Sequence, residues 1–498
     1  MSERRSVRFA PGSTTRSLVQ GLALLSLAVG LRASVFGNPN ALADDAFYFL
    51  VGQRMHEGLL PYVDVWDRKP PGLFVLYWAI AGISRAVIAY QLAATLFAAL
   101  TALVIGAIVT RWTGRQRGGL LAGMAYLLTL GPLDGFSGQS PVFYNLPVAL
   151  AALLVWQGGA RRGWLAMGLC GLALTIKQTC LFESVFLGGW LLWRLRAGGM
   201  AWPALAGRAL GFAAVGAAPF AAFALAYWWL GHFGEFWQAM VLSNLAKAPL
   251  AAGELQRAMA AMAVRLAVPV LVAAWGLWRG TWAEPDPRRF LAGWLAAGLA
   301  GMASVPHFFP HYALPWLVPL CAAAGLGFAR ARGGLVAFAL VAANGMLWYD
   351  PFDRAWNVHA IASTRALASA VVQNDHGRGL FVYDGPLQLY AMTDRPFMSP
   401  LVFTHHLNQA IERNVSHLDT DAEVDRVLAR HPGAVVTVLS PRNFPVNRHT
   451  WNAVQDYVRA NCRRVALVPS YDHMTITPTA VFGDCAPGPV SQPDRIVR

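Results

Sequence analysis

Charged residues are scarce in this sequence. Only 13% of its 498 residues are Asp, Glu, Lys or Arg, whereas soluble globular domains carry about 25%. Apolar stretches of about 20 residues recur instead through the first 350 positions. The composition therefore excludes a soluble enzyme and indicates a polytopic membrane protein.

Other signatures are missing as well. The sequence has no Cys-x-x-Cys pair, no nucleotide-binding P-loop and no Gly-x-Gly-x-x-Gly motif, so soluble nucleotide chemistry has no support. Of its five cysteines, Cys170, Cys180 and Cys321 lie in apolar stretches, where we expect them to pack. Cys462 and Cys485 lie in the charged C-terminal part. A disulfide and a pair of reduced, buried thiols are both open there.

The net charge of +14 lies entirely in the apolar part, because residues 350–498 hold 14 basic and 14 acidic residues. Seventeen arginines fall on one side of the membrane when the apolar segments are placed in order, against eight basic residues in the alternate loops. This asymmetry is typical of cytoplasmic loops, so it predicts topology and not a nucleic-acid partner. The seventeen are Arg4, Arg5, Arg8, Arg16, Arg111, Arg115, Arg117, Arg161, Arg162, Arg194, Arg196, Arg208, Arg279, Arg288, Arg289, Arg330 and Arg332.

Eleven spans fit this alternation, with the N-terminus in the cytoplasm and the C-terminal tail outside the cell's inner (plasma) membrane. We expect them at about 17–36, 86–110, 118–132, 144–159, 163–178, 180–194, 205–230, 262–278, 289–305, 311–329 and 334–349. Pro70 to Ser84 is apolar but too short to cross, so it is assigned to the outer interface. Counting it as a span would place the arginines outside.

The composition changes after Asp350. Residues 379–384, 434–439 and 464–468 read as buried strands, and 421–430 and 450–461 as helices. The sequence therefore predicts a polytopic all-α membrane domain over 1–349, followed by a small extracytoplasmic α/β domain over 350–498.

The first outer loop, 37–85, concentrates ionisable residues near an apolar surface, which calls for a function. Asp44 and Asp45 open an amphipathic stretch with Phe47, Leu50 and Val51 on one side. If the stretch is helical, both carboxylates lie at its positive N-terminal end. A simple capping pair is the alternative interpretation.

At this point the motifs resemble a known superfamily. DDAFYF (44–49), EGLLPY (57–62) and DRKPPG (67–72), followed by an aromatic-rich helix, resemble the first outer loop of lipid-linked-sugar glycosyltransferases with the GT-C fold. These include protein O-mannosyltransferases and aminoarabinose transferases. LALTIKQTCLF (172–182) and HYALPWLVPLCAAAG (311–325) resemble later segments of the same superfamily.

The resemblance implies roles for individual residues. Asp44 would be the general base and Asp45 its supporting or metal-binding neighbour. Lys69 would bind the donor phosphate, helped by Arg54, Arg68 and Lys177, although these three also suit anchoring at the interface. His311 and Tyr312, close to His307, would add to a phosphate or metal site, a weak signal with two histidines alone. Arg68 stands where the aminoarabinose transferases carry an acidic residue, so no cofactor is assigned and a divalent metal stays open.

The implied activity is inverting transfer of a sugar from a polyprenyl-phosphate donor to a hydroxyl acceptor, on a protein, lipid or glycan at the outer face of the bilayer. Inversion needs one base, whereas retention needs a nucleophile as well. A lipid-carrier-dependent ligase or polymerase would share donor and topology. A transporter or flippase is the other alternative, but it would be expected to show internal repeats and broken helices near the bilayer midplane, whereas here the charges gather in an outer loop. A non-catalytic scaffold would leave Asp44, Asp45 and Lys69 unexplained.

Overall fold

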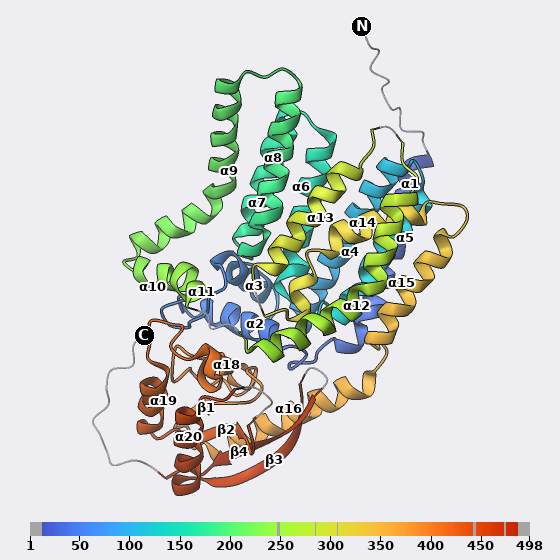
Figure 1. Cartoon of the computed structure of the whole chain (residues 1–498). Helices are drawn as coiled ribbons and strands as arrows, with labels where there is room; N and C mark the ends of the chain where they lie inside the picture. The colour runs from blue at the N-terminus through green and yellow to red at the C-terminus, as the bar shows by residue number, and fades with distance from the viewer. Residues whose placement is uncertain are drawn as a thin grey trace.

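Long helices form the chain up to Trp348 in the computed structural model, which describes residues 12–246, 250–283, 285–305, 307–441, 445–472 and 475–486 (Figure 1). These helices are α1 (Gly12–Arg32), α2 (Ala43–Met55), α3 (Pro71–Ile83), α4 (Ile88–Thr113), α5 (Gln116–Leu130), α6 (Ser140–Gln157), α7 (Ala160–Leu174), α8 (Leu181–Ala197), α9 (Trp202–Trp229), α10 (Phe233–Trp237), α11 (Ser243–Leu245), α12 (Ala252–Arg279), α13 (Arg288–Ala303), α14 (Leu317–Phe328) and α15 (Gly334–Trp348).

Each segment expected to span the membrane falls on one of these helices. Five helices among the described residues are long and apolar enough to cross by length and composition: α1, α4, α6, α9 and α12. The two largest differences from the expected boundaries are at the starts of α12 and α14. Helix α12 begins about three turns early, on a stretch made polar by Glu254 and Arg257, and α14 begins only at Leu317 because Pro310–Ala313 form a 3₁₀ turn. The number of crossings stays a prediction.

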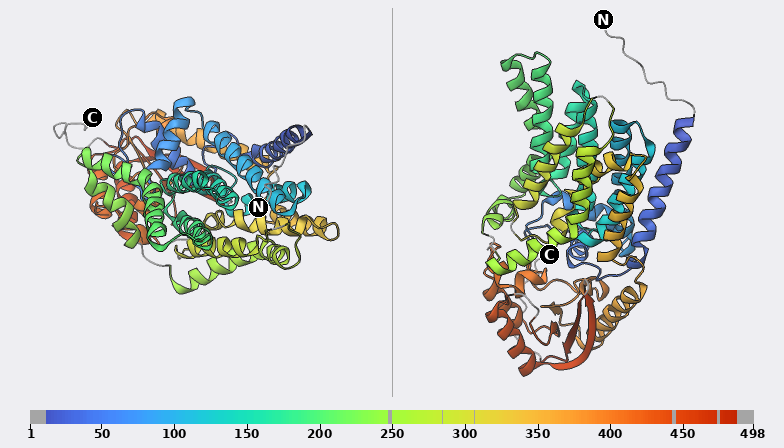
Figure 2. Two further views of the ribbon diagram at one scale, coloured as in Figure 1. Left: turned by 90° about the horizontal axis from the view of Figure 1, so that it is seen from above. Right: turned by 45° about the vertical axis from the view of Figure 1, so that its right-hand side comes forward.

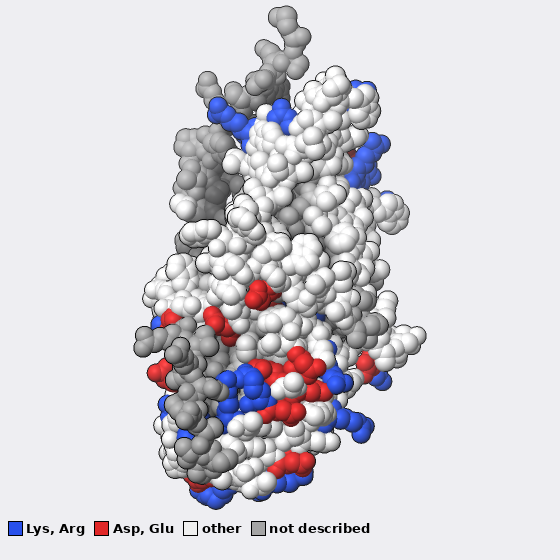
Figure 3. All heavy atoms as spheres, turned by 90° about the vertical axis from the view of Figure 1, so that its left-hand side faces the viewer, with Lys and Arg blue, Asp and Glu red and all other residues white. Residues whose placement is uncertain are grey.

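The helices of the bundle run side by side and pack closely through small residues (Figure 2). A Cβ added to Gly119 in α5 would stand 2.3 Å from the carbonyl oxygen of Gly106 in α4, so these two backbones are in direct contact. One face of the molecule is mostly uncharged along the bundle, with basic groups at its far end and both signs over the tail (Figure 3). That banding fits a membrane protein.

Helices α2 and α3 lie between the bundle and the tail (Figure 1). Helix α3 has 13 residues, a rise of roughly 20 Å at 1.5 Å per residue, which is less than the ~30 Å hydrocarbon core. The prediction of a one-sided, amphipathic α2 is wrong. Every residue of α2 from Asp45 to Arg54 is buried, because the tail covers the side that faces away from the bundle.

The tail contains a four-stranded sheet in the order β1 (Leu380–Val382), β2 (Ala434–Val438), β4 (Thr475–Gly483) and β3 (Arg463–Asp472). Strands β1 and β2 are parallel, and the other neighbours are antiparallel. Helices α16 (Arg354–Asn374), α17 (Leu389–Met392), α18 (Thr404–Asn408), α19 (Thr420–Ala429) and α20 (Arg448–Asn461) complete it. The three expected strands and two expected helices are present. The prediction that residues 464–468 are buried is wrong, because β3 lies at the edge of the sheet and Leu467 is 48% exposed.

Strand β4 and helix α16 were not predicted. Pro478 argues against an interior strand, but β4 pairs with β2 only beyond that proline, from Thr479 to Phe482. The structure also decides the open question about cysteine, since Cys462 and Cys485 are disulfide-bonded. Cys170, Cys180 and Cys321 are free and buried, as expected for packing residues. Arg4, Arg5 and Arg8 lie outside the described residues.

The predicted topology places the tail outside and the α4–α5 turn inside. A cysteine at Asp456, whose side chain is 74% exposed on α20, should react with a membrane-impermeant maleimide on intact cells. A cysteine at exposed Gln116 should react only after the cells are opened. The native cysteines leave little background because each is buried or bonded. Labelling of Gln116→Cys in intact cells would show that α3 crosses the membrane.

Candidate active site

A turn between α5 and α6 donates hydrogen bonds to two carboxylates at the start of α2. The backbone N–H of Gly138 donates to Oδ2 of Asp45 at 2.6 Å, and the side-chain amide of Gln139 donates to Oδ2 of Asp44 at 2.8 Å. Asp45 is fully buried, whereas Asp44 is only partly buried. Asp44 is therefore the carboxylate of the pair that a substrate can reach.

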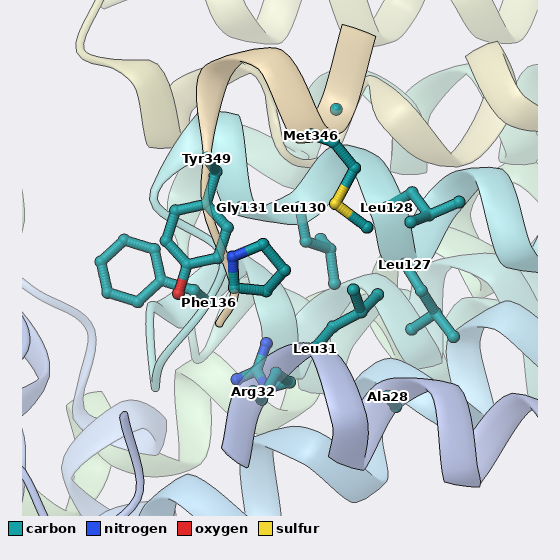
Figure 4. Close-up of a pocket in the computed structure, with 12 residues that line it drawn as sticks. Ala28, Leu31, Arg32, Leu127, Leu128, Leu130, Gly131, Phe136, Met346 and Tyr349 are labelled. Carbon is teal, nitrogen blue, oxygen red and sulfur yellow. The ribbon is translucent and has the colours of Figure 1, made fainter. Parts of the chain in front are cut away.

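Buried hydrogen-bond donors from other helices hold this turn in place. Arg32, at the end of α1, donates to the carbonyl oxygens of Gly135 and Ser137, and Tyr77 donates to that of Gly138 at 2.5 Å. Gly138 must be glycine, because a Cβ there would stand 2.4 Å from the Tyr77 hydroxyl oxygen. Arg32 also borders a small apolar cavity beside Tyr349 (Figure 4). These contacts hold the turn in one position against the helix.

The surroundings shift the pKa values of the two carboxylates in opposite directions. Burial raises the pKa of Asp45 to about 7, against the hydrogen bond from Gly138. Burial acts in the same sense on Asp44, but the positive charge of Lys69, with help from Gln139 and Lys177, lowers its pKa well below the usual range. Asp44 is consequently ionised at neutral pH, and Asp45 is divided between its two forms.

Two lysines from distant parts of the chain act on Asp44. The ammonium of Lys69 lies 5.3 Å from the ring centre of Tyr48, and that of Lys177 lies 5.2 Å from the ring centre of Tyr312. The sequence contains three lysines and 37 arginines, so two of its three lysines meet here. Sequence reasoning singled out both residues but did not use their rarity, which is a signal available without a structure.

His311 and Tyr312 flank the same place, with ring centres 4.5 Å apart. Burial lowers the pKa of His311 to about 4, so the imidazole is uncharged at neutral pH. Both line a small cavity, together with Lys177 and Glu183. Glu183 is 2% exposed and accepts from the indole of Trp294 at 2.7 Å. Sequence reasoning missed Glu183, although a carboxylate inside an apolar helix is itself a signal. His307 is buried nearby.

Arg54 is not brought to this cluster. It lies ten residues beyond Asp44 on α2, about 15 Å along the helix axis. Its guanidinium pairs with Glu57 at 2.7 Å and donates to the carbonyl oxygens of Tyr390 and Arg395 in the tail. The expectation that Arg54 binds the donor phosphate is therefore replaced by a role in holding the tail.

Arg68 lies at the edge of the cluster and forms an ion pair with Glu412 of the tail, in which both side chains are 10% exposed. Beside it, Trp66 is inserted into the hydrophobic core of the tail, and its backbone N–H donates to the carbonyl oxygen of Pro400 at 2.8 Å. The charge of Arg68 is thus already balanced by the carboxylate of Glu412.

Metal ligation has no visible basis among the described residues. No group of three or more His, Cys, Asp or Glu side chains in those ranges is arranged to hold an ion. The position before Lys69, where a carboxylate would add a ligand, is Arg68. The site therefore does not fit a metal centre.

Comparisons with known proteins bear on the fold. No protein-family model and no curated protein matches the sequence. The aminoarabinose transferase ArnT from Cupriavidus metallidurans bound to undecaprenyl phosphate is 14% identical, with a TM-score of 0.60 over 97% of this chain and 100% of that chain. Its apo structure is 15% identical, with a TM-score of 0.61 over 96% and 100%.

A third structure is the archaeal oligosaccharyltransferase AglB from Archaeoglobus fulgidus, in complex with an inhibitory peptide and a dolichol-phosphate. It is 12% identical over 86% of this chain and 70% of that chain, and its TM-score of 0.47 is too low to carry weight. This chain has the GT-C fold. The fold class expected from the loop motifs is therefore confirmed.

The raised pKa of Asp45 has a consequence for stability. A carboxyl whose pKa rises from 3.8 to about 7 on folding stabilises the protein fully below pH 3.8 and loses that contribution as the pH rises through 7. We expect Asp45→Asn to remove this dependence, so that the variant loses less stability than wild type between pH 5 and 8. Thermal unfolding in detergent at a series of pH values measures it. Parallel curves for the two proteins would contradict the assignment.

Proposed function

We propose that this protein is an integral-membrane glycosyltransferase that moves a sugar from a polyprenyl-phosphate donor to a hydroxyl acceptor with inversion. The observation that carries the proposal is one accessible, ionised carboxylate, Asp44, facing two lysines at the tail-facing end of a GT-C fold. The ArnT structure with undecaprenyl phosphate supports a lipid-phosphate donor.

In the proposed step the acceptor oxygen attacks the anomeric carbon while Asp44 takes the hydroxyl proton. A bond forms between that oxygen and the anomeric carbon, and the bond from the anomeric carbon to the phosphate oxygen breaks. The electron pair leaves with the polyprenyl phosphate. Lys69 and Lys177 stabilise the negative charge that grows on the phosphate, which is where fixed cations contribute most.

The same lysines control when Asp44 can act. Without donor, their charge keeps Asp44 a weak base. A bound phosphate compensates part of that charge, so the pKa of Asp44 rises and its affinity for a proton increases. Asp44 becomes an effective base only in the loaded site. Asp45, held by Gly138, positions α2 and contributes no proton transfer.

Substrate consumption tests the activity directly. Purified protein is incubated with a panel of polyprenyl-phosphate sugars, each with and without candidate hydroxyl acceptors. We expect one donor to be consumed, with release of free polyprenyl phosphate and a product of inverted anomeric configuration. Retention of configuration would exclude a single-base mechanism, and consumption of none across a broad panel would count against the proposal.

Asp44→Asn should lower the transfer rate by about 10²- to 10⁴-fold, the range for loss of a general base. Donor affinity should change little or increase, because the amide keeps the shape and removes a charge that repels phosphate. Single-turnover kinetics and donor binding are measured separately. Asp45→Asn is the matched control, and near-normal turnover of Asp44→Asn with loss in Asp45→Asn would reverse the two roles.

Lys69→Gln and Lys177→Gln should each weaken donor binding by about 10- to 100-fold, because each removes a charge-assisted contact to phosphate. Arg54→Gln is the comparison, since this guanidinium binds the tail. It should lower thermal stability while leaving donor affinity near wild type. Titration with the donor measures the donor affinity of all three variants. Equal losses of affinity in the three variants would contradict the assignment of the lysines.

A further inference from the structure

A cavity lies between α7, α8 and α9. It is separate from the cluster around Asp44, because it lies toward the ends of these helices that are farthest from the tail (Figure 1). Leu191, Leu195 and Phe212 form an apolar wall. Arg194 and Arg208 form its polar rim.

Positive charge around this cavity is not balanced by carboxylates. Five arginines lie near it: Arg161, Arg162, Arg194, Arg196 and Arg208. From Gly158 to Phe212 the sequence has a single acidic residue, Glu183, at the opposite end of α8. Among the described residues, none of the five arginines forms an ion pair with a carboxylate. The cavity therefore suits an anion.

Neutral groups hold the two rim arginines in place. Arg194 donates to the carbonyl oxygens of Val155 and Trp156, near the end of α6, at 3.1 and 2.9 Å. The guanidinium of Arg208 lies 5.3 Å from the ring centre of Trp164. Gly158, with φ of +71°, leaves space for Arg194, since a Cβ there would stand 3.1 Å from its guanidinium nitrogens. Both arginines are positioned without losing their charge.

Helix α9, which contributes Arg208 and Phe212 to the cavity, lies on the outside of the bundle (Figure 1). Helix α9 is apolar, yet only 6% of its most apolar window is buried inside the protein. Trp193 and Trp202, at the same end of α8 and α9, are 53% and 67% exposed. Exposed tryptophans gather at the level of lipid headgroups. The rim arginines therefore lie near the headgroups, and the apolar wall extends toward the acyl chains.

We propose that this cavity is a binding site for an anionic glycerophospholipid of the leaflet opposite the tail. The lipid phosphate contacts Arg194 and Arg208, and an acyl chain lies along Leu191, Leu195 and Phe212. A zwitterionic lipid binds less well, because its headgroup brings a cation to a cluster that offers no carboxylate. This site does not depend on the proposed sugar transfer.

Native mass spectrometry tests the proposal with purified full-length protein and equal amounts of phosphatidylglycerol and phosphatidylcholine with matched chains. Wild type should retain phosphatidylglycerol more than phosphatidylcholine, and Arg208→Gln should lower this preference about fivefold, since one arginine near the headgroups accounts for about that factor. Arg196→Gln is the matched control. This arginine lies over Trp202 at 4.9 Å and does not line the cavity, so the preference should persist.

Equal retention of both lipids by wild type would overturn the proposal, and so would an equal loss in Arg196→Gln, which would indicate a general positive surface. Thermal unfolding in a zwitterionic detergent checks that the variant is folded. Arg208→Gln should melt near wild type without lipid, and phosphatidylglycerol should raise the melting temperature of wild type more than that of the variant. Inorganic phosphate should give no such rise, and a rise equal to that from phosphatidylglycerol would exclude the lipid assignment.

Discussion

The hydrogen bond from the backbone of Gly138 to buried Asp45 is the contact on which the rest of the site depends. A carboxylate away from water must find donors in the protein, since an unpaired buried charge costs several kcal/mol. That requirement fixes where the turn after α5 lies relative to α2. Arg32 and Tyr77 then have to hold the turn from behind. The same turn also positions Asp44, because Gln139, whose side chain donates to Asp44, directly follows Gly138 in the chain.

Adjacent residues with the same side chain thus acquire different chemistry from their surroundings. Asp45 faces a backbone N–H in a dry environment, where the protonated form becomes competitive. Asp44 faces lysines and remains an anion. Two neighbouring ionised carboxylates would repel each other. This repulsion is reduced because cations lie near Asp44, whereas burial of Asp45 favours its neutral form.

Much of the bundle and part of the site follow from sequence because the signals are local or topological. Apolar length predicts the helices, and the alternation of arginine-rich loops puts Asp44, Lys69, Lys177 and His311 at one end. The tail contacts do not follow in this way. Arg54 and Arg68 look like free cations in the loop, and only the docking of residues more than 330 positions later shows that they are paired.

The role of the turn at Gly138 and Gln139 could not be predicted from the sequence either. Its role rests on a backbone N–H, which every residue except proline carries, and on an amide of ordinary sequence context. Strand β4 was missed because the effect of Pro478 depends on which neighbour it faces. In both cases the deciding fact is spatial proximity between segments that no local pattern connects.

The partners of the first outer loop also impose an order on biogenesis. Gln388 donates to the carbonyl oxygen of Ala46 at 2.6 Å, and Glu412 pairs with Arg68, so groups about 340 residues apart complete one structure. At a synthesis rate of roughly 5–20 residues per second, the ribosome needs on the order of tens of seconds to reach them. During that interval α2 lacks the cover that the tail provides. A nascent chain therefore cannot complete the surroundings of α2 until translation is nearly finished, which ties maturation to completion of the polypeptide.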